Sequence, residues 1–291
     1  MLGLVEGITE YLPVSSTGHL ILASALLGLD DPERKRAVDA FNIVIQGGAI
    51  LAVAGLYRTH VARMLRGAVG RDAAGQRLLL CLVVAFLPAA LLGPLLDEWI
   101  EAKLFHAPPV LAALALGGVW MIWLGRRGAD GARPGSPAGS AGSADLAPAA
   151  LEALPFRHAL VIGLFQCVAM WPGTSRSMMT IAGGTLLGLR PREAAEFSFL
   201  LGLPTLGAAC LYKLASNLRR SAADGTPDLF EQLGAANALL GLAVATLSAA
   251  LAVRWLVAFL SRHGLAVFGW YRLGLCAVLA ALIASGALVI G

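Results

Sequence analysis

Long apolar segments separated by short charged loops run through most of the chain. A helix needs about 20 mainly apolar residues to cross the hydrocarbon core of a bilayer. Six segments come close to or exceed this length, and we expect each to form a transmembrane helix: 40–57, 78–96, 109–125, 197–214, 234–260 and 268–290. The pattern therefore predicts an all-α polytopic membrane protein with six transmembrane helices.

Two further apolar segments, 2–29 and 158–189, are interrupted near their middles. Pro13 interrupts the first and is followed by hydroxyl residues; Pro172 and Gly173 interrupt the second and are followed by hydroxyls and an arginine. At membrane depth, the backbone groups left unpaired by such a break are tolerated only where protein or a watery cavity surrounds them. We therefore expect each segment to form two half-helices of a re-entrant hairpin.

The two interrupted segments also resemble each other. Residues 3–6 (GLVE) match 163–166 (GLFQ), and 26–29 match 186–189 (both LLGL), with an offset of 160 residues at both ends. Each half then contains one hairpin and three spans, and an odd number of spans places the second half inverted relative to the first. We predict a first repeat over 1–127, a flexible Gly-, Ala-, Ser- and Pro-rich loop over 128–155, and a second repeat over 156–291.

Loop charges predict the orientation. One set of loops carries 13 Lys and Arg against six acidic residues: 58–77, 126–157, 190–196 and 254–263. The opposite set carries 7 Lys and Arg against ten acidic residues: 30–39, 97–108 and 213–231. By the positive-inside rule, the first set is cytoplasmic and both termini face outward.

Composition removes several other classes of protein. With 58% hydrophobic and 14% charged residues and a mean hydropathy of +0.75, a soluble globular fold is excluded. The net charge of +4 forms no basic stripe with interleaved aromatic residues, so we expect no nucleic-acid partner. The four cysteines lie in apolar segments and predict neither disulfides nor a zinc site. Glu6 and Glu10 interrupt the first apolar stretch, so a cleaved signal peptide is not expected.

Glu6 and Glu10 lie four residues apart, on one face of the first half-helix. A charged side chain near the bilayer centre costs about 2.5 to 3.5 kcal/mol, so two acids need a compensating cation. Metal binding or acid–base chemistry is one interpretation. The alternative is that the hairpin is short and both carboxylates reach water among the lipid headgroups.

The hydroxyl run after Pro13 includes Ser15, Ser16 and Thr17, and His19 follows about one helical turn into the second half-helix. A hydroxyl at this position caps a helix, and the exposed N–H groups of a helix N-terminus bind anions. Ser16 or His19 can serve as a nucleophile, or these residues are an ordinary cap and an interior histidine.

The second break has the same form with different chemistry. Ser175, Arg176 and Ser177 begin a half-helix, and Thr180 lies one turn further on. The guanidinium of Arg176 stays charged and has planar donors that match phosphate oxygens, so it requires an anion within the membrane. That anion is a phosphate or, in the alternative interpretation, the carboxylate of Glu6 or Glu10 in a structural salt bridge.

Together these residue types suit phosphoryl transfer. An arginine and two helix N-termini bind the phosphate, a divalent cation on the carboxylates neutralises more of its charge, and Ser or His supplies a nucleophile. A site within the bilayer implies an amphiphilic substrate with a lipid tail. We expect both breaks to converge on one shared hollow.

The segments 6–19 (EGITEYLPVSSTGH) and 172–177 (PGTSRS) resemble the two signatures of the bacterial undecaprenyl-diphosphatase family, also called the bacitracin-resistance family. The resemblance implies hydrolysis of undecaprenyl diphosphate, a polyprenyl diphosphate lipid, and dependence on Mg²⁺ or Ca²⁺. Matched by position, Glu6 and Glu10 form the acidic motif for metal coordination or acid–base chemistry, with Ser16 and His19 each a nucleophile candidate; a neutral His19 can instead activate Ser16. The phosphate-binding residues are then Ser15, Thr17, Ser175, Arg176, Ser177 and Thr180.

The resemblance also implies recycling of the lipid carrier for cell-wall synthesis and bacitracin resistance. It implies a multi-pass protein of the bacterial inner membrane, surrounded by membrane lipids, whose active site opens outward. Family members carry more apolar residues before the first glutamate, so the first half-helix is expected to be clipped. Family precedent suggests a homodimer, and the small residues of 241–252 could pack at its interface or, equally well, inside one chain. A secondary transporter or lipid-phosphate flippase would share this fold and is the alternative function.

Overall fold

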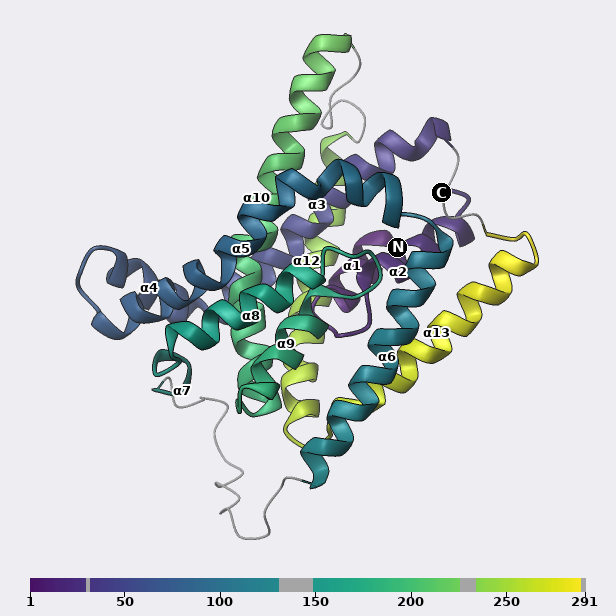
Figure 1. Ribbon diagram of the computed structural model, residues 1–291. Helices are drawn as coiled ribbons and strands as arrows, with labels where there is room; N and C mark the ends of the chain where they lie inside the picture. The colour runs from purple at the N-terminus through teal and green to yellow at the C-terminus, as the bar shows by residue number, and fades with distance from the viewer. Residues whose placement is uncertain (30–31, 131–148, 226–233, 289–291) are drawn as a thin grey trace.

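The computed structural model describes residues 1–29, 32–130, 149–225 and 234–288, and every regular element within them is a helix (Figure 1). In chain order the helices are α1 Leu2–Thr9, α2 Ser16–Leu26, α3 Pro32–Leu56, α4 Arg58–Ala68, α5 Ala73–Leu104, α6 Ala107–Asp130, α7 Ala149–Glu152, α8 Phe156–Val168, α9 Arg176–Leu186, α10 Pro191–Asp224, α12 Ala235–Leu260 and α13 Ala266–Ala284. The predicted all-α class is confirmed for these residues.

Five helices are long and apolar enough to cross a membrane: α5, α6 over 107–126, α10, α12 and α13. They coincide with five of the six predicted spans. Both α5 and α10 extend beyond the apolar segments that predicted them. The start of α5 is fixed by Asp72, whose carboxylate accepts a hydrogen bond from the Gly75 amide at 2.8 Å, as a helix N-cap does.

The sixth predicted span, 40–57, lies in α3 and ends at a sharp turn. The chain bends by 84° between α3 and α4, and the two helices count as a sixth candidate span only if taken together. Arg63 of α4 forms ion pairs with Asp72, the N-cap of α5, and with Glu152 of α7. The polar face of α4 is therefore bound to these two segments. The predicted end of the span at residue 57 agrees with the end of α3 at Leu56.

Both interrupted segments form two helices, as predicted. The first gives α1 and α2, and the second gives α8 and α9. Of the predicted loop 128–155, residues 131–148 lie outside the described residues, whereas 128–130 continue α6 and 149–152 form α7.

The first helix of each interrupted segment packs closely on a long helix of the other half. α1 packs on α12, where a methyl group added to Gly3 would lie 2.9 Å from the carbonyl oxygen of Gly241. α8 packs on α5, where a methyl group added to Gly163 would overlap the carbonyl oxygen of Ala85. The small residues of 241–252 therefore support packing within the chain, one of the two interpretations given above.

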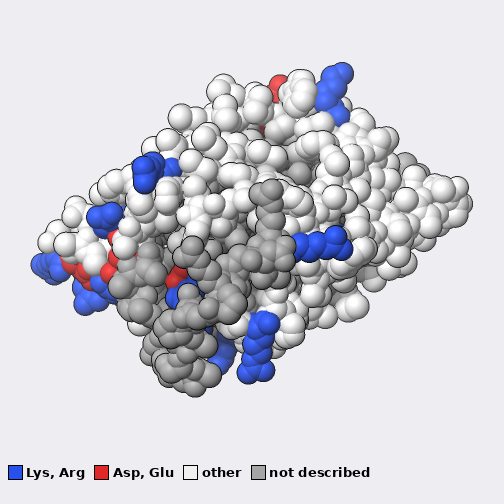
Figure 2. All heavy atoms as spheres, turned by 60° about the horizontal axis from the view of Figure 1, so that its bottom comes forward, with Lys and Arg blue, Asp and Glu red and all other residues white. Residues whose placement is uncertain are grey.

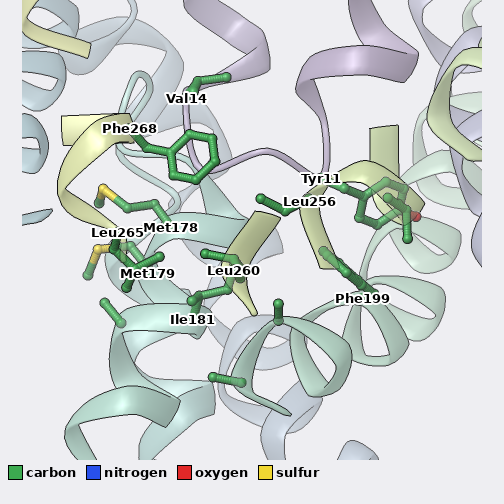
Figure 3. Packing of buried hydrophobic residues seen from close by; sticks show 14 of the residues in the cluster. Tyr11, Val14, Met178, Met179, Ile181, Phe199, Leu256, Leu260, Leu265 and Phe268 are labelled. Atoms are coloured by element: carbon green, nitrogen blue, oxygen red, sulfur yellow. The ribbon is translucent and has the colours of Figure 1, made fainter. Parts of the chain in front are cut away.

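A buried cluster joins the two breaks. Figure 3 shows Tyr11 and Val14 of the first break in the same packed group as Met178 and Ile181 of α9, with Phe199 of α10 beside Tyr11. The rings of Tyr11 and Phe199 meet edge to face with centroids 5.4 Å apart. This apolar packing fixes the two breaks relative to each other and supports the polar residues that they carry.

The ends of the long helices separate into two groups. In Figure 1 the end of α6, the α12–α13 turn and α7 lie at the bottom, and the start of α3 and the end of α10 lie at the top. Figure 2 looks toward the bottom of that view, and Lys and Arg side chains are spread around this face. The arrangement agrees with the two sets of loops defined by charge.

Candidate active site

The two breaks share one backbone device. Ser15 and Ser175 both have φ of 74°, and they are the only non-glycine residues with positive φ in the described part of the chain. Each is the N-cap of the helix that follows: Ser15 Oγ accepts from the Gly18 amide at 3.4 Å, and Ser175 Oγ accepts from the Met178 amide at 3.3 Å. Positive φ strains a residue with a Cβ atom, and such strain is concentrated at functional sites.

Glu10 connects the two breaks. Its Oε1 accepts a hydrogen bond from Arg176 Nη2 at 3.1 Å, and its Oε2 accepts from Ser16 Oγ at 2.9 Å. The glutamate and the arginine are both largely shielded from solvent. Arg176, Glu10 and Ser16 therefore lie together, as predicted. The anion that faces Arg176 in this structure is the Glu10 carboxylate, which is the alternative given above to a bound phosphate.

Arg176 is held on two further sides. Its Nη1 donates to the carbonyl oxygen of Ser198 on α10 at 2.9 Å, and its guanidinium lies 5.3 Å from the centre of the Tyr11 ring. Its Nε is buried and has no hydrogen-bond partner in the described part of the chain. The N–H at Nε is therefore left to bind a ligand.

The hydroxyls of the second break bind neighbouring backbone and side chains. Ser177 Oγ donates to the carbonyl oxygen of Leu12 at 2.9 Å, which ties the second break to the first. Ser177 also shares a hydrogen bond of 3.0 Å with Ser175. Thr180 lies 2.6 Å from the hydroxyl of Ser198. These predicted phosphate-binding hydroxyls lie together, and several of them already have protein partners.

His19 does not contact Ser16. Its Nδ1 lies 2.7 Å from the carbonyl oxygen of Ser15, and its Nε2 lies 2.7 Å from the hydroxyl of Tyr271. Because a carbonyl can only accept, Nδ1 carries the proton in this bond, and a neutral ring then accepts the Tyr271 proton at Nε2. The imidazole is stacked on the Tyr271 ring at a centroid distance of 5.6 Å. Thr17, the remaining predicted residue, is half-buried in the first turn of α2.

Glu6 lies one turn before Glu10 and is 3% exposed. Its Oε2 is buried without a hydrogen-bond partner among the described residues. The described residues contain no group of three or more His, Cys, Asp or Glu that could hold a metal. Mg²⁺ is often bound by one or two carboxylates together with substrate phosphates, so this pair fits part of such a site.

Sequence reasoning missed Arg272 and Tyr271 of α13 and Ser198 of α10. Arg272 is completely buried and donates from Nη2 to the carbonyl oxygens of Gly173 at 2.8 Å and Ala113 at 3.0 Å. A sequence signal existed, because an arginine inside an apolar span is rare and is a functional candidate by default. Ser198 and Tyr271 carry no such signal.

Two cavities lie beside the long helices. One of about 240 Å³ is lined by residues of α3, α10 and α12, among them Gly47, Cys210 and Leu242. The other, of about 500 Å³, lies along α12 and also includes Leu242. Neither is lined by a predicted site residue, so the shared hollow between the breaks stays a prediction.

Fold and site together define a class of protein. It is a multi-pass α-helical membrane protein with a buried polar centre that contains an ion pair. This centre lies where the second helix of each interrupted segment, α2 or α9, begins. The sequence profile of the family described as Bacitracin resistance protein BacA matches residues 1–278. The chain belongs to this family.

Individual relatives extend the comparison over nearly the whole chain. An undecaprenyl-diphosphatase of Sorangium cellulosum is 45% identical over 279 residues, covering 96% of this chain and 83% of that protein. Undecaprenyl-diphosphatase 1 of Chromobacterium violaceum is 41% identical over 273 residues, covering 94% and 91%. An undecaprenyl-diphosphatase of Cereibacter sphaeroides is 40% identical over 287 residues, covering 98% and 96%.

Proposed function

We propose that this protein hydrolyses undecaprenyl diphosphate to undecaprenyl phosphate and inorganic phosphate. Family membership and the names of the relatives support the assignment. The observation that carries it is the hydrogen-bonded group of Arg176, Glu10 and Ser16, which places a cation, a base and a hydroxyl together. The reaction recycles the lipid carrier for cell-wall synthesis and confers resistance to bacitracin.

In the proposed mechanism, the substrate phosphate replaces Glu10 as the anion facing Arg176. Glu10 is then free to accept the proton of Ser16 as the Ser16 oxygen attacks the terminal phosphorus. The bond to the bridging oxygen breaks, and undecaprenyl phosphate leaves. Water next hydrolyses the phosphoserine and releases inorganic phosphate. The hydrogen bond from Ser16 to Glu10 supports Ser16 as the nucleophile, because both His19 nitrogens are bound elsewhere.

We propose that Glu6 and Glu10 hold a divalent cation, Mg²⁺ or Ca²⁺. The buried Oε2 of Glu6, without a partner among the described residues, supports this. A bound divalent cation neutralises charge on the phosphate oxygens. The two carboxylates lie on one helix face, so substrate and water oxygens would complete the ligand set.

We further propose that the two interrupted segments are re-entrant hairpins in two inverted repeats, completed by six transmembrane helices. The matching φ values of Ser15 and Ser175 and the packing of α1 on α12 and α8 on α5 support this. The basic face in Figure 2 supports a cytoplasmic location for that end, with the active site opening to the outer face of the bacterial inner membrane. A homodimer remains part of the proposal from family precedent.

Release of inorganic phosphate from undecaprenyl diphosphate by purified protein in detergent tests the activity. We expect release that stops with a chelator and returns with added Mg²⁺ or Ca²⁺. A protein that only transports lipid phosphates would release none. Full release in the presence of chelator would overturn the proposed cation while leaving the phosphatase assignment in place.

A further inference from the structure

Arg272 carries a buried charge without a visible counterion. Its side chain is the largest that is fully buried, at 0% exposed. Nη2 donates to the two carbonyl oxygens given above, but Nε and Nη1 are buried and have no hydrogen-bond partner in the described residues. No carboxylate of those residues lies within ion-pair distance of it. An arginine remains protonated, and a buried unpaired charge is costly.

The position of Arg272 connects it to both breaks. Its hydrogen bond to Gly173 reaches the second break, three residues before Arg176. The preceding residue, Tyr271, holds His19 of α2. Two consecutive residues of α13 therefore contact the two interrupted segments, one each. Arg272 therefore lies directly beside the backbone of the second break.

Carboxylates of the site cannot serve as the missing anion. Glu10 already accepts from Arg176 and Ser16. Glu6 forms no ion pair with Arg272 among the described residues. A ligand can therefore supply the missing negative charge.

We propose that Arg272 is a second anion-binding guanidinium of this site and binds oxygens of the diphosphate headgroup. This inference rests on the proposed function for the identity of the headgroup. Two guanidinium groups can spread the charge of a transferred phosphoryl group over several oxygens, which is the main requirement of phosphoryl transfer. Arg176 approaches from α9, and Arg272 approaches from α13 behind the second break.

Gly117 provides a way to displace Arg272 without changing its charge. A methyl group at Gly117 would lie 2.6 Å from Arg272 Nη2, and this flexible end of the side chain must move. Gly125 is the matched control, because it lies on the same helix and its added methyl group would meet the Ala266 backbone nitrogen at 2.7 Å. Gly125→Ala therefore disturbs the packing of α6 on α13 without touching Arg272.

The experiment measures dissociation constants of inorganic diphosphate and inorganic phosphate for the purified full-length protein in detergent, by calorimetry. Turnover is not required, so the result is independent of whether the protein hydrolyses a prenyl diphosphate. We expect Gly117→Ala and Arg272→Lys to weaken diphosphate binding at least about tenfold, the loss of one charge-assisted hydrogen bond. We expect Gly125→Ala to bind as the wild type does.

Two outcomes would overturn the proposal. Wild-type diphosphate affinity in both Gly117→Ala and Arg272→Lys would show that Arg272 does not bind the headgroup. If the variants weaken only the binding of inorganic phosphate, Arg272 binds the released product and not the diphosphate headgroup of the substrate. Because Arg272→Lys keeps the charge and Gly117→Ala keeps the arginine, the test does not depend on the folding of a variant that lacks the buried charge.

Discussion

The two breaks share a capping serine with positive φ and differ in their chemistry. Ser15 and Ser175, separated by 160 residues, have identical φ and the same capping hydrogen bond. At the same offset, Glu6 corresponds to Gln166 and Ser16 to Arg176. The first break therefore carries the acids and the second carries the cation.

The side chains that differ between the breaks show what each half contributes to the site. The shared backbone points the N-termini of α2 and α9 toward one region, which favours anions whichever side chains are present. Only the side chains that differ form the Glu10–Arg176 ion pair.

The largest expected effect comes from removing the cation of the second break. Arg176→Gln should lower kcat by at least about a hundredfold, because it removes charge stabilisation from the developing phosphate oxygens. The rate at which inorganic phosphate is released from a saturating prenyl diphosphate measures kcat. Arg192→Gln is a matched control, since Arg192 forms an ion pair of 3.2 Å with Glu196 outside the breaks. Full activity in Arg176→Gln would remove the phosphate-binding assignment.

A smaller effect is expected from the acids of the first break. Glu10→Gln should reduce kcat/KM more than Glu6→Gln, because Glu10 contacts both Arg176 and Ser16 whereas Glu6 contacts neither. Glu6→Gln also installs the residue that the second half carries at the equivalent position, Gln166. Melting temperatures of both variants serve as the folding control. Wild-type rates in both would reject any part for the carboxylates in the reaction.

Local sequence was enough to predict the breaks and their residues. A proline followed by several hydroxyl residues favours the end of one helix and provides an N-cap for the next, so Pro13 and Pro172 indicate both interruptions. Because Arg176 stays charged, it requires an anion at any depth in the membrane. Glu10 is one of the two carboxylates predicted as that anion. These predictions rest on rules that act over a few residues or on charge alone.

Contacts between distant segments could not be predicted in this way. Whether Ser16 or His19 lies beside Glu10 depends on how α2 is rotated, and Tyr271 of α13 fixes that rotation by holding His19. The bond from Arg176 to the Ser198 carbonyl depends on the packing of α9 on α10. The predicted span 40–57 ends close to the end of α3 at Leu56, but the 84° bend into α4 and the ion pair of Arg63 with Glu152 of α7 depend on distant packing and were not predicted.

The smallest expected effect tests the feature that the breaks share. Ser15→Ala and Ser175→Ala each remove a cap, worth about 0.5 to 2 kcal/mol, while keeping the Cβ atom that strains a residue at φ of 74°. Ser15→Gly and Ser175→Gly lose the same cap but adopt positive φ freely, so each should melt above its alanine counterpart. Thermal unfolding in detergent gives the four values. If the difference between the glycine and alanine variants is clearly unequal at the two positions, the breaks do not share one strained backbone position, and the comparison between them fails at its backbone.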